Sequence, residues 1–197
     1  MDPTQDCIQY LHDFHYDKYT YLLLFLAAIT NGLSQAATKQ TGKNMAFPVV
    51  LIMAIVFGGI FGVMTYYIYA AMASWTGTWV SGKADTKSLL RVFAHGMFPI
   101  ALSLVVICAQ ILVFGEEMFR KELDIENYDA AHTAFYFIAA LIEVSLGIWA
   151  ICITIVGISE IQQISIGKAI LNVILPGLII VAVVAAVMLP FVWLRQP

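Results

Sequence analysis

Residues 139–157 read AALIEVSLGIWAICITIVG, an apolar run that contains one carboxylic acid, Glu143. About 20 predominantly apolar residues are enough for a helix to cross the hydrocarbon of a bilayer. The run therefore predicts a membrane-spanning helix with an acid at depth. The role of that acid is the main functional question that the sequence raises.

The whole chain has the composition of a membrane protein. Of its 197 residues, 61% are hydrophobic and 12% are charged, and the mean hydropathy is +0.85. A soluble domain has about 25% charged residues. Its net charge of −3 and the lack of a basic stripe argue against nucleic acid as a partner. Lipid is therefore the expected solvent for most of the chain.

Five apolar segments are long enough to span the bilayer as helices, because none alternates with the period of two that barrel strands require. They cover residues 20–38, 46–74, 91–115, 131–157 and 168–194. We therefore predict an all-α membrane protein, a compact bundle of five transmembrane helices over residues 20–194. A short amphipathic segment, residues 1–19, is expected to lie on the membrane surface before it.

Basic residues leave the orientation open. The loops on the side of the N-terminus and those on the opposite side carry equal numbers of Lys and Arg: Lys18, Lys83, Lys87, Arg91 and Lys168 against Lys39, Lys43, Arg120, Lys121 and Arg195. Only the local cluster in residues 83–91 favours a cytoplasmic N-terminus by the positive-inside rule. Five spans then place the C-terminus outside.

The face of the fourth span around Glu143 consists mostly of small or polar residues. At 100° per residue this face includes Tyr136, Ala139, Ala150 and Thr154, whereas the opposite face is bulky and apolar. Small and polar faces pack against other helices in membranes. Glu143 is therefore expected to point into the bundle.

A carboxyl group at mid-membrane costs free energy unless it is neutral, hydrogen-bonded or hydrated. Asn31, Ser103 and Thr65 are the depth-matched candidate partners and form a candidate intramembrane polar site with Glu143. Two interpretations stay open. Glu143 is either a protonated tie between helices or part of a site for a proton, a cation or another ligand.

Small residues repeat along the second span. Ala54, Gly58 and Gly62 are spaced four residues apart and lie in one row. Such a row lets two helix backbones approach closely. It predicts either packing within the bundle or a face for dimerisation.

The loop after the third span is acidic. Glu116, Glu117 and Asp124 are oxygen ligands that could hold a divalent cation weakly, although a solvated acidic loop is the alternative. The three cysteines lack the spacing of a metal motif. No metal site and no cofactor are therefore expected.

Motifs that would mark an enzyme are missing from the sequence. It contains no HExxH, no GxSxG and no Walker loop. No intramembrane serine lies beside a histidine to form a nucleophile and base. The chain is therefore not expected to be an enzyme.

Three stretches together resemble the Yip family of five-pass membrane proteins in its prokaryotic form. They are WTGTWVSGKADTKSLLRVFAHGMFPIALSL (75–104), LVFGEEMF (112–119) and LGIWAICITIVGISEIQQISIGKAILN (146–172). The recognisable features are the Trp-rich end of the second span, a Gly-Lys loop, Pro99, FGEE, IW, the G-x-x-E-x-Q turn and Lys168. Their order and spacing extend the resemblance from about residue 20 to residue 192.

The resemblance implies a five-helix bundle with a cytoplasmic N-terminus in a prokaryotic cell membrane, and no enzymatic activity. Eukaryotic members are similar in architecture and interact with prenylated Rab GTPases and with one another. This chain lacks their long N-terminal domain and their DLYGPFW-type motif, so Rab binding is doubtful for it. Other integral membrane proteins, or a second copy, are the partners that the resemblance suggests.

Two functions follow from these observations. The first is a non-enzymatic scaffold or accessory protein that binds other integral membrane proteins or itself, surrounded by membrane lipid. The second is a small channel or transporter for protons, cations or an apolar solute, with Glu143 in the bundle interior.

Overall fold

The computed structural model describes residues 19–120 and 128–193. The predicted amphipathic segment over residues 1–19 therefore lies, except for Tyr19, outside the described residues. The described part is helical and contains no strand, which confirms the all-α class. Five of its segments are long and apolar enough to span a membrane, as the sequence predicts.

Several spans are built from more than one helical piece. The first span is α2 (Thr20–Thr38), followed by the short η2 (Thr41–Lys43). The second is α3 (Phe47–Met53), the π-helical η3 (Ala54–Gly58) and α4 (Gly59–Trp79). The third is α5 (Thr86–Gly96) and α6 (Phe98–Phe114), followed by the short α7 (Glu117–Arg120). The fourth is α8 (Ala130–Gln162), and the fifth is α9 (Ile166–Trp193).

The helix boundaries follow local sequence signals. Asp85 caps α5 by accepting a hydrogen bond from the backbone N–H of Ser88, and Asp129 caps α8 through the N–H of His132 in the same way. Hydrogen bonds from Ser88 also lower the pKa of Asp85 below its usual value. Pro99, in the first turn of α6, divides the third span because proline cannot continue the hydrogen bonds of α5. Gly115 has a φ of 59° and ends α6.

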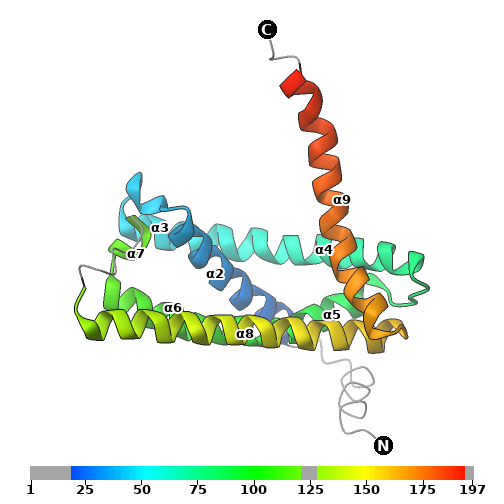
Figure 1. The fold of residues 1–197 in the computed structure, drawn as a ribbon, viewed down its shortest axis with the longest axis horizontal. Helices are drawn as coiled ribbons and strands as arrows, with labels where there is room; N and C mark the ends of the chain where they lie inside the picture. Colours follow the sequence, from blue (N-terminus) through cyan, green and yellow to red (C-terminus); the bar gives the residue numbers. More distant parts are fainter. Residues whose placement is uncertain (1–18, 121–127, 194–197) are drawn as a thin grey trace, which may run out of the picture.

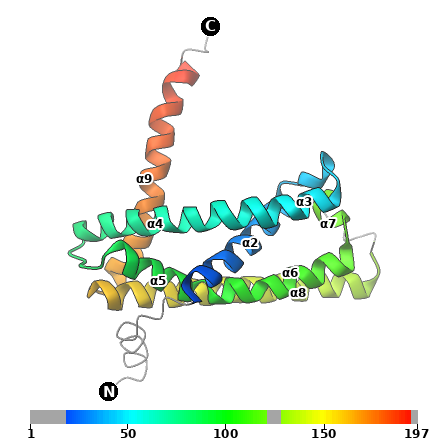
Figure 2. The same cartoon turned by 180° about the vertical axis from the view of Figure 1, so that it is seen from behind.

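The helices form two layers with α2 between them. Figures 1 and 2 show α3 and α4 on one side, α5, α6 and α8 on the other, and α2 running diagonally across the space between. One end of the bundle contains η2, α7 and the start of α8, which we call the η2 end. The opposite end contains the α4–α5 turn, the end of α8 and the start of α9, which we call the α9 end.

The row of small residues on the second span packs against α2 within the same chain. A Cβ atom added to Gly58 would lie 3.0 Å from the Cα of Gly32, and one added to Gly62 would lie 2.4 Å from the Cβ of Ala28. Ala54 is buried against the same helix. The structure therefore shows this row packing against α2 within the same chain.

The face of α8 that carries Glu143 packs on the bundle as predicted. Ala139, Ala150 and Thr154 are buried, whereas the bulky residues of the opposite face are exposed. This separation of small from bulky residues directs the Glu143 side chain towards α6 and α2.

The last helix departs from a compact bundle. Its first turns pack on α4 and α8, with Ala169, Asn172 and Pro176 buried. From Ile180 to Met188 every residue is exposed. Figures 1 and 2 show α9 pointing away from the other four spans.

Candidate functional site

Glu143 lies close to the middle of α8. The midpoint of Ala130–Gln162 is three residues further along, which is about 4–5 Å at 1.5 Å of rise per residue. Because α8 is longer than the bilayer hydrocarbon requires, this position places the carboxyl group deep in the membrane.

A polar cleft of about 520 Å³ reaches Glu143 from the η2 end. It lies between α2, α6 and α8. Its polar lining residues come from these helices and the turn after α2: Ser34, Thr38, Gln40, Gln110, Tyr136 and Glu143. Since Gln40 lies in the turn beyond α2, the cleft extends from a loop at the bundle end to mid-helix.

The carboxyl group of Glu143 and the carboxamide of Gln110 of α6 lie together in this cleft. The Oε1 atom of Glu143 is buried and has no partner among the described residues. An unpaired carboxyl oxygen in a low-dielectric region is costly. The cleft therefore has room beside this oxygen for a water molecule, a cation or a hydrogen-bond donor of a ligand.

α5 packs closely on α8 between Glu143 and the α9 end. A Cβ atom on Gly96 of α5 would lie 2.2 Å from the Oγ1 of Thr154, and one on Gly157 would lie 2.7 Å from the Cγ1 of Val92. Such close packing of α5 on α8 leaves no room for a water-sized path between them. The described residues that line the Glu143 cleft extend from mid-helix towards the η2 end.

The residues proposed as partners of Glu143 form hydrogen bonds elsewhere. The Asn31 Nδ2 donates to the Tyr66 hydroxyl at 2.9 Å. The Thr65 Oγ1 donates to the carbonyl of Phe61 at 2.8 Å, and the Ser103 Oγ to the carbonyl of Ile100 at 2.8 Å. Asn31 and Thr65 line a second groove, on a different face of α2.

Gln110 was not selected from the sequence as a partner of Glu143. It lies four residues before α6 ends at Phe114. The helical spacing of Tyr136, Ala140 and Glu143 on one face of α8 was the available signal for the cleft.

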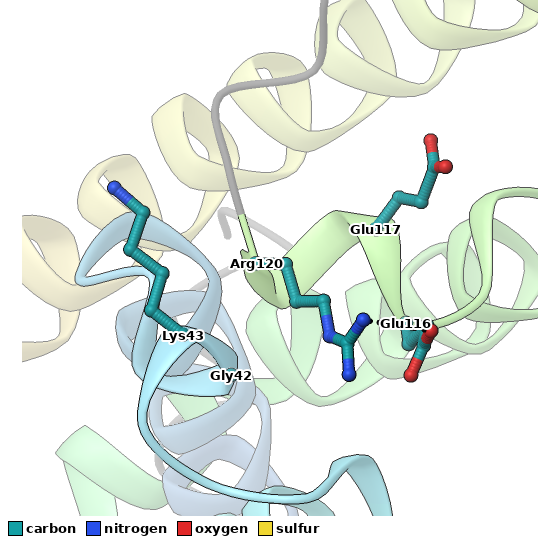
Figure 3. Close-up of a pocket in the computed structure, with 5 residues that line it drawn as sticks. All are labelled: Gly42, Lys43, Glu116, Glu117 and Arg120. Carbon is teal, nitrogen blue, oxygen red and sulfur yellow. Dashed lines mark ion pairs between the residues drawn. The ribbon is translucent and has the colours of Figure 1, made fainter.

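The predicted acidic cluster is divided between two interactions. Glu116 forms an ion pair with Arg120, with 3.1 Å between Oε1 and Nη1, and Glu117 accepts a hydrogen bond from the hydroxyl of Tyr128. Figure 3 shows Glu117 directed away from that ion pair, in a cavity of about 480 Å³ that Gly42 and Lys43 also line.

Asp124 lies outside the described residues. Within residues 19–120 and 128–193, no group of three His, Cys, Asp or Glu residues could hold a metal ion.

The model of the Yip1 domain family matches residues 16–188. The chain belongs to the Yip1 family. This match confirms the resemblance and covers all five spans up to Met188. No curated protein and no solved structure gives a match. The chain is thus a multi-pass membrane protein with a Yip1 domain.

Three of the Yip1 features, the Trp-rich end of the second span, the Gly-Lys loop and the G-x-x-E-x-Q turn, meet at the α9 end of the bundle. The fully buried side chain of Gln162, from the G-x-x-E-x-Q turn, lies against Gly77 at the end of α4 and Gly82 of the Gly-Lys loop. Thr76 donates to the Oδ1 of Asn172 in α9 at 2.8 Å. These contacts join the second, fourth and fifth spans and the loop between the second and third.

The polar atoms at this junction are incompletely paired. Both the Oε1 and Nε2 of Gln162 and the Nδ2 of Asn172 are buried and have no partner within the described residues. Steric fit therefore holds Gln162 in place, since hydrogen bonds to its carboxamide do not. The sequence did not indicate this burial, because a Gln near a helix end is usually exposed.

Proposed function

We propose that this Yip1 protein is a non-enzymatic membrane scaffold that binds another integral membrane protein or a second copy of itself. Yip family proteins are not known as enzymes, and the spans account for nearly all of the described chain. We also propose a prokaryotic cell membrane as its location, with the N-terminus in the cytoplasm and the C-terminus outside. Lys83, Lys87 and Arg91, together at the α9 end, support this orientation.

The position of α9 carries the proposal. In α4 and α8 one face packs on neighbouring helices, whereas residues 180–188 of α9 expose every side chain. Transmembrane helices associate by close van der Waals packing along their length. Residues 180–188 make no such packing with the described residues of the chain, so the circumference of this part of α9 is available to a helix of another protein.

A photo-crosslinking amino acid tests where the partner lies. We expect Val181→benzoylphenylalanine to form an adduct of defined mass with one protein in native membranes. Leu141 of α8 is the matched control, since the two side chains are 66% and 68% exposed. Equal protein crosslinking from both positions, or adducts with lipid alone from Val181, would contradict a partner on α9.

The Glu143 cleft supports a second candidate function, passage of a proton or a cation. A polar path leads from the η2 end to a carboxyl oxygen with no partner among the described residues. In this proposal α5 and α8 separate at Gly96 and Thr154, where they pack closely, to extend the path to the α9 end. The cleft would then act as one half of an alternating-access path.

A flux assay tests this candidate. If the cleft conducts, proteoliposomes should show a proton or monovalent-cation flux that Glu143→Gln reduces by at least about tenfold, because the neutral amide can neither release a proton nor balance a cation. Ser145→Ala, at an exposed position on α8, should leave the flux unchanged. Absence of flux in the wild type would remove the candidate and leave the scaffold proposal intact.

A further inference from the structure

A second groove, of about 580 Å³, follows the face of α2 that points away from the Glu143 cleft. Its two walls differ in chemistry. The α2 wall carries Asn31, Gln35 and Lys39, and the opposite wall includes Phe57 and Phe61, whose rings stack at 5.9 Å. We call it the α2 groove.

The polar wall runs from the membrane surface into the hydrocarbon. Asn31, Gln35 and Lys39 are spaced four residues apart and are all exposed on one face of α2. Lys39 lies just beyond the helix end, and Asn31 lies about 12 Å further in along the helix. The polar interfacial layer is only about 5–7 Å thick on each side of a bilayer. Asn31 is therefore deeper than headgroups and water normally reach.

The hydrogen bonds on this wall leave donors available. Lys39 donates to the Oε1 of Gln35 at 3.2 Å, and Asn31 donates to the hydroxyl of Tyr66 at 2.9 Å. The amide N–H groups of Gln35, the second N–H of Asn31 and the Tyr66 O–H have no partner within the described residues. Unpaired donors facing hydrocarbon are unfavourable, so a ligand rich in acceptors is the complement.

The charge at the groove entrance is positive. No carboxylate of the described residues pairs with Lys39, whereas Arg120 nearby is neutralised by Glu116. A fitting ligand has an anionic group at the surface, acceptor oxygens several ångströms deeper and an apolar chain beyond them. A diacyl phospholipid has these three parts in this order.

We propose that the α2 groove binds one anionic glycerophospholipid from the leaflet at the η2 end. Its phosphate pairs with Lys39, and its ester carbonyls accept from Gln35, Asn31 and Tyr66. An acyl chain lies on Phe57 and Phe61. The site is separate from both the Glu143 cleft and the exposed half of α9, so it does not depend on the proposed function.

Native mass spectrometry of delipidated protein in detergent tests the proposal, with phosphatidylglycerol and phosphatidylcholine of identical acyl chains as probes. We expect the first phosphatidylglycerol to bind about fivefold more tightly than phosphatidylcholine, the preference that one lysine at a membrane surface provides. Lys39→Gln should abolish the preference. Lys43→Gln is the matched control, because Lys43 is exposed at the same end but lines the other cavity, shown in Figure 3, and it should keep the preference.

Gln35→Leu separates the deep contacts from the surface charge. This substitution should weaken the binding of both lipids by a similar factor, because both carry ester carbonyls. Equal binding of the two lipids to the wild type would overturn the proposal. An equal loss of the preference for phosphatidylglycerol in Lys39→Gln and Lys43→Gln would do the same. So would a photo-crosslinker at Phe57 that forms protein adducts and no lipid adduct in native membranes, since a partner helix would then fill the groove.

Discussion

Replacing Gly62 with alanine should destabilise the protein by about 1–3 kcal/mol, the usual cost of forcing an extra methyl group into a packed interior. The new Cβ would lie 2.4 Å from the Cβ and 3.2 Å from the Cα of Ala28. A backbone atom cannot move aside as a flexible side chain can, so α2 and α4 must separate. The midpoint of thermal unfolding in detergent measures the effect.

Gly147→Ala is the matched control for this prediction. Gly147 also lies within a transmembrane helix, but no atom lies within 4 Å of a Cβ added there. The same change should be neutral or stabilising by about 0.5–1 kcal/mol, because alanine is the better helix former. Similar midpoints for the two variants would show that α2 and α4 do not approach as closely as described.

Gly82→Ala should have a comparably large effect at the α9 end. Its Cβ would lie 1.9 Å from the Oε1 of Gln162 and 3.0 Å from the carbonyl oxygen of Gly77. The Gln162 side chain is fully buried and already in contact with Gly77, so it has no free space to enter. We expect a loss of about 1–3 kcal/mol by the same overpacking.

A second substitution shows whether Gln162 causes this loss. In a Gln162→Ala background, Gly82→Ala should cost about 0.5–3 kcal/mol less than in the wild type, the coupling usual for residues in contact. Gly167→Ala, at the same end but with no atom within 4 Å of the added Cβ, should show no such coupling. Additive effects of Gly82→Ala and Gln162→Ala would contradict the role assigned to Gln162.

Much of the fold follows from residue patterns within single helices. The apolar runs predict all five spans, and the small residues around Glu143 predict which face of α8 is buried, because both properties depend only on helical period and lipid solvation. The internal packing of Gly58 and Gly62 was one of two outcomes left open. Choosing between them required the position of Gly32, which belongs to another helix.

Properties that depend on relations between helices were harder to predict. Gln110 of α6, and not Ser103, lines the cleft with Glu143, and Ser103 donates to the carbonyl of Ile100 in its own helix. The burial of Gln162 depends on two glycines that are far away in sequence. The direction of α9 likewise depends on a few contacts in its first turns, and hydropathy contains no information about them.

Purification of the tagged wild-type protein from native membranes after crosslinking tests the scaffold proposal most directly, with mass spectrometry identifying what comes with it. The proposal predicts another integral membrane protein, or a second copy of this chain, in a constant ratio to it. That protein should no longer co-purify when bulky side chains are introduced along residues 180–188 of α9. It should still co-purify with the Glu143→Gln variant. A chain that remains monomeric and alone under gentle extraction would contradict the proposal.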